Sequence, residues 1–249
     1  MKFYRRLSPI KAISFDLDDN LYSNKPIMVA IEKKMIAYFS QTLGDKLHTL
    51  PKNHDGFTHK FWFYFRKQAI TKQPELKHDV VRIRFVAYQL GIEALGYSPQ
   101  TAANMAQAAL DYFICLRSGF SVPESSIRLL SQLSQCFPLV AISNGNVDTK
   151  ALGIDQFFQY IYHAGWQKNG ELLRQKPAAD MFELACKQLA IEPKQLLHVG
   201  DCGQSDIQGA LNAGCQAAWL SCYDVGKPIN ILPHIELSQI SQLNELLTS

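Results

Sequence analysis

Residues 10–20 read Ile-Lys-Ala-Ile-Ser-Phe-Asp-Leu-Asp-Asp-Asn, a short apolar and β-prone segment that ends at a cluster of carboxylates. An apolar run with this boundary is typical of a buried strand, so residues 10–15 predict a strand whose C-terminal end carries Asp16 and Asp18. Two carboxylates one residue apart can converge on one cation, whereas without a cation they would repel each other. A turn or helix-capping cluster is the alternative interpretation, and the pair alone leaves it open.

Three further segments repeat this plan along the second half of the chain. Residues 138–142 and 196–199 are apolar and run into polar residues, and a fourth expected strand spans 215–220. Helical patterns occupy residues 178–189 and 205–212, and the second of these ends near Gly214. Strands alternating with helices predict an α/β fold with a parallel sheet and helices on both of its faces.

The segment from about residue 25 to residue 118 has a different pattern. It contains no convincing strand, and its apolar residues recur at helical spacing, as in Met28, Ile31, Met35 and Phe39. We therefore expect a helical domain, residues 23–118, inserted into an α/β core formed by residues 1–22 and 119–249. The insert leaves the core at the C-terminal edge of the sheet, where ligands bind in such folds.

Composition excludes several classes of protein. The chain has 249 residues, 47% of them hydrophobic, which excludes a disordered, collagen-like or coiled-coil chain. Lys and Arg number 25 against 22 Asp and Glu, so charge does not indicate nucleic-acid binding. Six cysteines without a C-x-x-C pair, and no long apolar run, predict a cytoplasmic protein with reduced thiols and no membrane partner. Protein partners are left open.

Polar residues follow the other expected strands too. A hydroxyl and an amide at Ser143 and Asn144 are suited to donating hydrogen bonds to a phosphoryl oxygen, although they also suit a turn. Lys176 precedes Pro177 at the expected start of a helix, where a lysine is usually on the surface. Asp201 follows a strand, and Asp206 could simply complement a helix dipole. All of these residues lie in the expected core and none lies in the insert.

In this order, the segments resemble the four motifs of the haloacid dehalogenase superfamily, at residues 16–20, 143–145, 176–177 and 200–206. The resemblance covers about residues 10–22 and 120–235. It implies a Rossmann-like core in which the helical insert takes the place of the family's C1 cap. Within the superfamily, the chain is most similar to bacterial phosphatases associated with riboflavin synthesis. That similarity implies a small phosphorylated metabolite as substrate, such as 5-amino-6-(5-phospho-D-ribitylamino)uracil or FMN.

The resemblance also implies a role for each motif residue. Asp16 would be the nucleophile that forms an aspartyl-phosphate, and Asp18 the general acid and base. Mg²⁺ would be bound by Asp16, Asp201 and the backbone carbonyl of Asp18. The phosphoryl oxygens would be held by Ser143, backbone amides near Asn144, and Lys176. Asp206 would orient Lys176 or a metal-bound water.

One residue departs from the family pattern. Asn20 stands where the family usually has Thr. Asn can hydrogen-bond to nearby backbone and tolerates turn conformations. We therefore expect the change to affect loop geometry and rate more than the class of reaction.

The insert is expected to close over the site and to contact the leaving group. Our choices for this surface are Trp62, His78 and Arg82, with Phe63, Tyr64, Arg84 and Arg117 as further candidates. The opposing interpretation is that the aromatic residues form a core and the arginines are solvated.

Three other functions remain open: a phosphomutase, a dehalogenase, and an inactive protein that binds a phosphorylated ligand. Asp18 argues against dehalogenation, because a departing halide needs no proton and the dehalogenase branch lacks this acid.

Overall fold

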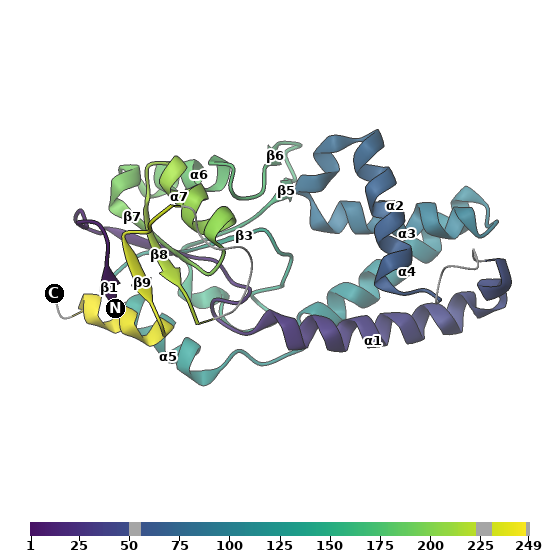
Figure 1. The fold of residues 1–249 in the computed structure, drawn as a ribbon, viewed down its shortest axis with the longest axis horizontal. Coiled ribbons are helices and arrows are strands. Elements are labelled where there is room, and N and C mark those ends of the chain that lie inside the picture. Colours follow the sequence, from purple (N-terminus) through teal and green to yellow (C-terminus); the bar gives the residue numbers. More distant parts are fainter. Residues whose placement is uncertain (50–55, 223–230, 248–249) are drawn as a thin grey trace. The chain divides into compact units, whose positions relative to one another are not determined.

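The computed structural model describes residues 1–49, 56–222 and 231–247, which divide into two compact units. The α/β unit comprises Met1–Asn24 and Phe120–Ser249, and the helical unit comprises Lys25–Gly119. Figure 1 shows the elements of both units along the chain.

The α/β unit is built on a seven-stranded sheet with the strand order β1-β9-β8-β7-β2-β3-β4. All neighbouring strands are parallel except β1, which pairs with β9 in the antiparallel sense. The strands of this sheet are β1 Lys2–Phe3, β2 Ala12–Phe15, β3 Leu139–Ser143, β4 Tyr160–His163, β7 Leu196–Gly200, β8 Gln216–Leu220 and β9 Ile235–Leu237. A separate two-stranded hairpin is formed by β5 Gly165–Trp166 and β6 Leu172–Leu173.

The parallel α/β architecture predicted from the sequence is confirmed, and its four expected strands correspond to β2, β3, β7 and β8. Strand β4 was not expected. It lies at the sheet edge, its four residues are only half-buried, and one of them is His163. An edge strand of this kind lacks the continuous apolar run by which the buried strands are recognised.

Helices cover the sheet on both faces. In Figure 1, α6 (Asp180–Leu189) and α7 (Gly209–Asn212) lie on one face, and α5 (Glu124–Leu133) lies on the other beside the C-terminal 3₁₀ helix Ile240–Leu247. Val140 and Ile142 of β3 belong to the same buried apolar cluster as Met181 and Phe182 of α6.

Two helix predictions need correction. Helix α6 begins at Asp180, two residues after the expected start, and Pro177 precedes it. The helix expected over 205–212 is a π-helical turn, Gly203–Gln208, followed by the short α7. The chain leaves α7 through Gly214, whose φ of 77° is a left-handed conformation that glycine adopts without strain.

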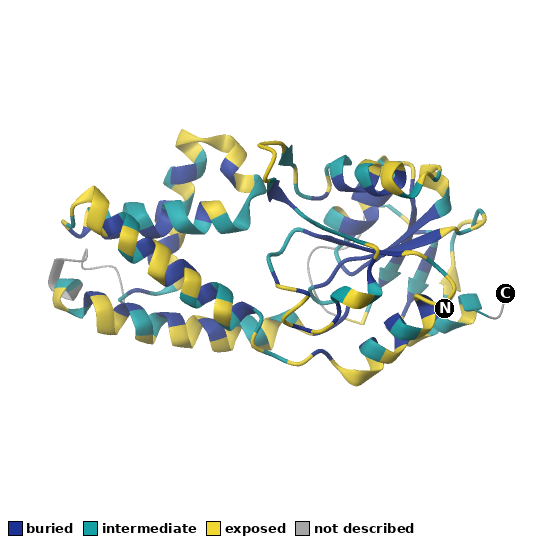
Figure 2. Ribbon diagram, turned by 180° about the vertical axis from the view of Figure 1, so that it is seen from behind, coloured by how far each residue is buried: buried dark blue, intermediate teal, exposed yellow. Residues whose placement is uncertain are grey.

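Four long helices form the helical unit: α1 Asn24–Leu43, α2 His59–Lys72, α3 Val80–Ala94 and α4 Pro99–Arg117. Its described residues, 25–49 and 56–119, contain no strand. Helix α3 is capped by Asp79, whose carboxylate accepts hydrogen bonds from the backbone of Val81 and Arg82. The sides of these helices that face one another carry the buried residues in Figure 2.

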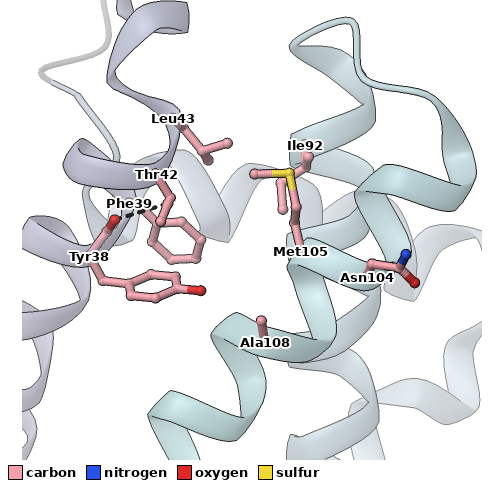
Figure 3. Close-up of a pocket in the computed structure, with 8 residues that line it drawn as sticks. All are labelled: Tyr38, Phe39, Thr42, Leu43, Ile92, Asn104, Met105 and Ala108. Carbon is pink, nitrogen blue, oxygen red and sulfur yellow. Dashed lines mark hydrogen bonds between the residues drawn. The ribbon is translucent and has the colours of Figure 1, made fainter.

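A cavity of about 250 Å³ lies among α1, α3 and α4 of this unit (Figure 3). Its lining is mostly apolar and contains no carboxylate, imidazole or cationic side chain: Tyr38, Phe39, Thr42, Leu43, Ile92, Asn104, Met105 and Ala108. Apart from the phenol of Tyr38, the lining therefore offers no ionisable group for acid–base or metal chemistry. Among the described residues, no helix is both long and apolar enough to span a membrane.

Candidate active site

The C-terminal ends of three adjacent strands bring the core motifs together. Asp16 follows β2, Ser143 ends β3 on one side of it, and Asp201 follows β7 on the other side. A pocket of about 170 Å³ lies at these ends and is lined by Asp16, Asp18, Asp19, Ser143, Asn144, Gly145, Lys176, Asp201, Cys202, Ser205 and Asp206. The structure thus places every residue predicted for the core site on one pocket of the α/β unit.

Lys176 lies at the centre of this arrangement and is not a surface residue, since only 2% of it is exposed. Its Nζ donates to Asp16 Oδ1 at 2.7 Å, to Asp206 Oδ1 at 2.6 Å and to the carbonyl oxygen of Ile142 at 2.7 Å. An ammonium group has three N–H donors, so all of them are used within the protein. Burial acts to lower the pKa of Lys176, but the two carboxylates outweigh it and raise the pKa.

Asn144 holds the backbone of Lys176 in place. Its Nδ2 donates to the carbonyl oxygen of Lys176 at 3.0 Å, and its Oδ1 accepts from the backbone N–H of Lys176 at 2.7 Å. This pairing turns the side-chain amide towards Lys176, and phosphoryl binding by backbone amides near Asn144 stays a prediction.

Three buried carboxylates, those of Asp16, Asp201 and Asp206, each present an oxygen within 4.8 Å of the others. Burial raises the pKa of Asp16 to about 7 even though Lys176 opposes it. Burial and the charge of Asp206 raise the pKa of Asp201 to about 8. Both carboxyls therefore favour a nearby cation, which would stabilise their ionised forms.

Asp206 differs from the other two carboxylates because its oxygens already have donors. Oδ1 accepts from Lys176 Nζ, and Oδ2 accepts from the backbone N–H of Cys202 at 2.9 Å. Although burial acts to raise the pKa of Asp206, Lys176 and His198 outweigh that effect and lower it. Asp206 is thus a permanent anion that orients Lys176, a role beyond that of a surface helix-dipole partner.

Asp18 is oriented from two sides. Tyr22 donates its hydroxyl to Asp18 Oδ1 at 2.9 Å. A Cβ added to Gly145 would lie 2.8 Å from Asp18 Oδ2 and 3.3 Å from Ser143 Oγ. The absence of a side chain at Gly145 therefore leaves the space that the carboxyl of Asp18 occupies.

Asn20 joins the ends of β2 and β7. Its buried Nδ2 donates to the backbone carbonyls of Asp16 and Val199, each at 2.9 Å. The expected backbone hydrogen bonding of Asn20 is therefore observed, and it holds together the strands that carry Asp16 and Asp201. The neighbouring Asp19, with a φ of 52°, accepts from the backbone N–H of Asn24 at the start of α1.

Four residues of this region were not expected from the sequence. Cys202 and Ser205 line the pocket, and His163 Nδ1 lies 3.0 Å from the carbonyl oxygen of Gly145. The fourth, His198, lies within β7 and is completely buried. A single polar residue in an otherwise apolar strand is the signal by which His198 could have been found.

The structure buries some of the residues chosen on the insert and exposes others. Trp62 is buried among aromatic residues, and its Nε1 donates to the carbonyl oxygen of Phe57 at 3.2 Å. The expectation that Trp62 stacks on a substrate is therefore wrong, because its ring belongs to the core of the helical unit. Phe63 and Tyr64 on the same helix are exposed.

The arginine candidates also differ in how far they are buried. Arg84 lies over the ring of Phe113, with its guanidinium carbon 3.6 Å from the ring centroid, and Arg117 is buried, so both are integrated into the helical unit. Arg82, in the first turn of α3, is exposed, and His78, at the end of the 3₁₀ turn Pro74–His78, is half-buried. His78 and Arg82 stay predictions.

Comparison with known proteins gives consistent matches over the length of the chain. A sequence model of the haloacid dehalogenase-like hydrolases matches residues 10–214. The chain is 34% identical to the 5-amino-6-(5-phospho-D-ribitylamino)uracil phosphatase YigB of Escherichia coli (strain K12), over 99% of this chain and 100% of that protein. It is 28% identical to the N-acylneuraminate-9-phosphatase of Homo sapiens, over 63% of this chain and 65% of that protein.

A solved structure of similar architecture is the 2-haloacid dehalogenase from Pseudomonas syringae pv. Tomato DC3000. Its TM-score is 0.82 at 26% sequence identity, covering 96% of this chain and 98% of that chain. The relatives therefore include both phosphatases and a dehalogenase.

Proposed function

Because this chain belongs to the haloacid dehalogenase-like hydrolases and is a phosphatase, we propose that it cleaves phosphomonoesters through a phosphoryl-Asp16 intermediate with Mg²⁺ as cofactor. The observation that supports this most strongly is the hydrogen bond between Lys176 Nζ and Asp16 Oδ1. It fixes one carboxylate oxygen and leaves the other for attack on phosphorus. Asp201 and Ser143 line the same pocket.

The cation is supported by the donor set. Asp16 and Asp201 provide hard carboxylate oxygens, and burial together with the neighbouring carboxylates raises the pKa values of both. We propose that these two carboxylates and the backbone carbonyl of Asp18 hold Mg²⁺. Asp206 is excluded because its Oδ1 already accepts from Lys176 and His198 and its Oδ2 from the backbone of Cys202, whereas the hydrogen bond from Lys176 to Asp16 engages Oδ1 alone. When bound, Mg²⁺ supplies positive charge that neutralises the phosphoryl group during attack.

In the first step, Asp16 forms a bond to phosphorus and the ester P–O bond breaks. The leaving oxygen receives a proton from Asp18, which Tyr22 orients. In the second step, water attacks the same phosphorus, Asp18 takes the proton, and the bond to Asp16 breaks to release phosphate. Ser143 Oγ and the backbone N–H of Asn144 donate to the phosphoryl oxygens, while Lys176 holds the nucleophile.

Asp18 also helps to distinguish ester hydrolysis from dehalogenation. A dehalogenase releases a halide ion that needs no proton, so an oriented carboxyl beside the nucleophile favours ester cleavage. An inactive ligand-binding protein would not need a lysine whose three donors converge on a buried nucleophile and its neighbours. These two features support hydrolysis over the dehalogenase and inactive alternatives.

The proposed substrate is 5-amino-6-(5-phospho-D-ribitylamino)uracil, with FMN as a related compound. Support comes from the similarity to YigB, which covers 99% of the chain, including the helical unit.

We propose residues 1–22 and 119–249 as the catalytic core and residues 23–118 as the cap that recognises the leaving group, because the core motifs bind only the phosphoryl group. His78 and Arg82 are the proposed cap contacts. The cytoplasmic location and the lack of nucleic-acid and membrane partners also stay predictions.

A comparative kinetic assay tests this proposal. The purified protein is given Mg²⁺ and, in turn, p-nitrophenyl phosphate, the uracil intermediate, FMN, a nucleotide, a short sugar phosphate and N-acylneuraminate 9-phosphate. We expect Mg²⁺-dependent hydrolysis, with the largest kcat/KM for the two ribityl phosphates. A larger kcat/KM for the nucleotide or either sugar phosphate would overturn the substrate assignment alone, whereas no hydrolysis of any ester would overturn the reaction.

A further inference from the structure

A buried chain of hydrogen bonds leads from the interior of the sheet to the nucleophile. Ser14 on β2 and His198 on β7 are direct partners in the parallel register of these strands. The Oγ of Ser14 lies 2.9 Å from His198 Nδ1, and His198 Nε2 lies 3.3 Å from Asp206 Oδ1. Neither Ser14 nor His198 has any exposed surface. The mechanism described above uses neither residue.

The partners assign the proton positions on the imidazole. Asp206 is ionised, so it accepts hydrogen bonds and His198 Nε2 must carry the proton. Burial lowers the pKa of His198, which keeps the ring neutral and leaves Nδ1 as an acceptor. The hydroxyl of Ser14 then donates to Nδ1. Each polar atom of the imidazole therefore has one partner of the correct kind.

The chain continues through Asp206 into the active site. The same Oδ1 that accepts from His198 also accepts from Lys176 Nζ, which in turn donates to Asp16 Oδ1. Asp206 lies directly against β7, because a Cβ on Gly200 would overlap its carboxyl group. Because these contacts are direct, a change at His198 reaches Asp16 through two side chains, those of Asp206 and Lys176.

We propose that His198 is a positioning residue: by holding Asp206 in place, it keeps Lys176 directed at the nucleophilic carboxylate of Asp16. The inference rests on the proposed reaction at Asp16. It differs from a purely structural role, in which the imidazole would only fill space and satisfy buried polar atoms. In that case activity would depend on the size of the side chain at position 198 and on the stability of the core, and it would not depend on an N–H donor at that position.

Three variants separate these roles. His198→Phe keeps an aromatic ring and removes the donor, whereas His198→Gln keeps a neutral N–H donor without the ring. Phe182→Leu is the matched control, because Phe182 packs edge-on against the imidazole, with ring centroids 4.9 Å apart, and takes no part in the hydrogen-bond chain. Kinetics with p-nitrophenyl phosphate and Mg²⁺ are measured for each, together with thermal unfolding.

We expect His198→Phe to lower kcat about 10- to 100-fold, the scale of a misplaced reacting group, with KM within about threefold. His198→Gln should restore kcat to within about fivefold of wild type, and Phe182→Leu should lower the unfolding temperature without a comparable loss of kcat. Equal losses in the Phe and Gln variants, or activity that follows stability across all three, would overturn the inference.

A second measurement applies if His198→Phe does not fold. Long-range ¹H–¹⁵N NMR of the wild-type protein should show the Nε2–H tautomer of His198. In kinetic assays, Ser14→Ala should lower kcat about threefold, whereas Ser14→Thr, which keeps the hydroxyl, should preserve it. An Nδ1–H tautomer would contradict the chain. An active wild type with unaffected variants overturns this inference alone, whereas a wild type that hydrolyses no ester overturns the proposed function as well.

Discussion

The α/β unit and the helical unit use their buried side chains in opposite ways. At the ends of β2, β3 and β7, buried polar groups such as Asp16, Lys176 and Asp206 satisfy one another through short hydrogen bonds. The helical unit instead buries mainly aromatic and aliphatic groups, and its cavity has no ionisable side chain other than Tyr38. The reaction chemistry that we propose therefore belongs to the α/β unit, and substrate selection is expected from surface residues of the helical unit.

The largest expected effect is at the nucleophile. Asp16→Asn keeps the shape of the side chain but removes its negative charge, so activity should fall by about three or more orders of magnitude. Circular dichroism should show an unchanged fold. Activity above about a tenth of wild type would remove Asp16 from the proposed chemistry.

The second prediction separates Asp18 from Asp16. Asp18→Asn should lower kcat about 10²- to 10⁴-fold for substrates with poor leaving groups, because both proton transfers are lost. Half-saturation by Mg²⁺ should stay within about threefold, since only the backbone carbonyl of Asp18 is a proposed ligand. Loss of Mg²⁺ binding with intact single-turnover chemistry would reverse the assigned roles.

The third prediction concerns pH. In the metal-free protein the pKa of Asp201 is raised from 3.8 to about 8, so its carboxyl is mostly protonated at pH 6. Because Mg²⁺ must displace this proton, Mg²⁺ affinity should increase by about tenfold per unit between pH 7 and 8 and then level off. Below pH 7 the increase should be steeper, because the carboxyl of Asp16, whose pKa is raised to about 7, must lose its proton too. Calorimetric titration between pH 6 and 9 measures this. Affinity that does not change between pH 6 and 8 would contradict the assignment of Asp201 as a ligand.

The helical unit supplies the fourth prediction. Arg82→Ala and His78→Ala should each lower kcat/KM about tenfold for the ribityl phosphates while sparing p-nitrophenyl phosphate, which lacks the distal groups. Trp62→Ala is the contrasting variant. It should destabilise the protein by about 3–5 kcal/mol in chemical denaturation, because it opens a cavity in the aromatic core. Equal losses on both substrates for Arg82→Ala would remove that residue from substrate selection.

The smallest effect is expected at Asn20. Asn20→Thr replaces two amide hydrogen bonds by one hydroxyl donor, so kcat should stay within about tenfold of wild type. A gain of more than about a hundredfold would instead show that Asn20 marks a degraded site.

The sequence predicts those features of the fold and the site that depend on short stretches of neighbouring residues. The buried strands β2, β3 and β7 have continuous apolar runs, and their topology alone brings Asp16, Ser143 and Asp201 to one edge of the sheet. Strand β4 has a half-buried and partly polar sequence, so its pattern carries no comparable signal.

Contacts between distant side chains lie beyond such patterns. The pairing of Asn144 with the backbone of Lys176 joins residues 32 positions apart, and the bond from Ser14 to His198 spans 184. In the helical unit, periodicity does not distinguish a core tryptophan from one that binds substrate, so the sequence alone does not place Trp62 in the core.

The most direct test of the covalent mechanism is to trap phosphorylated Asp16. Asp18→Asn is mixed with p-nitrophenyl phosphate and Mg²⁺, quenched in acid, and digested for mass spectrometry. The nitrophenolate group leaves without a proton, so Asp16 should become phosphorylated while hydrolysis of the intermediate is slowed. The account predicts a phosphoryl group on Asp16 that is absent from the Asp16→Asn, Asp18→Asn double variant. Turnover with no such adduct, or with the adduct on another residue, would contradict it.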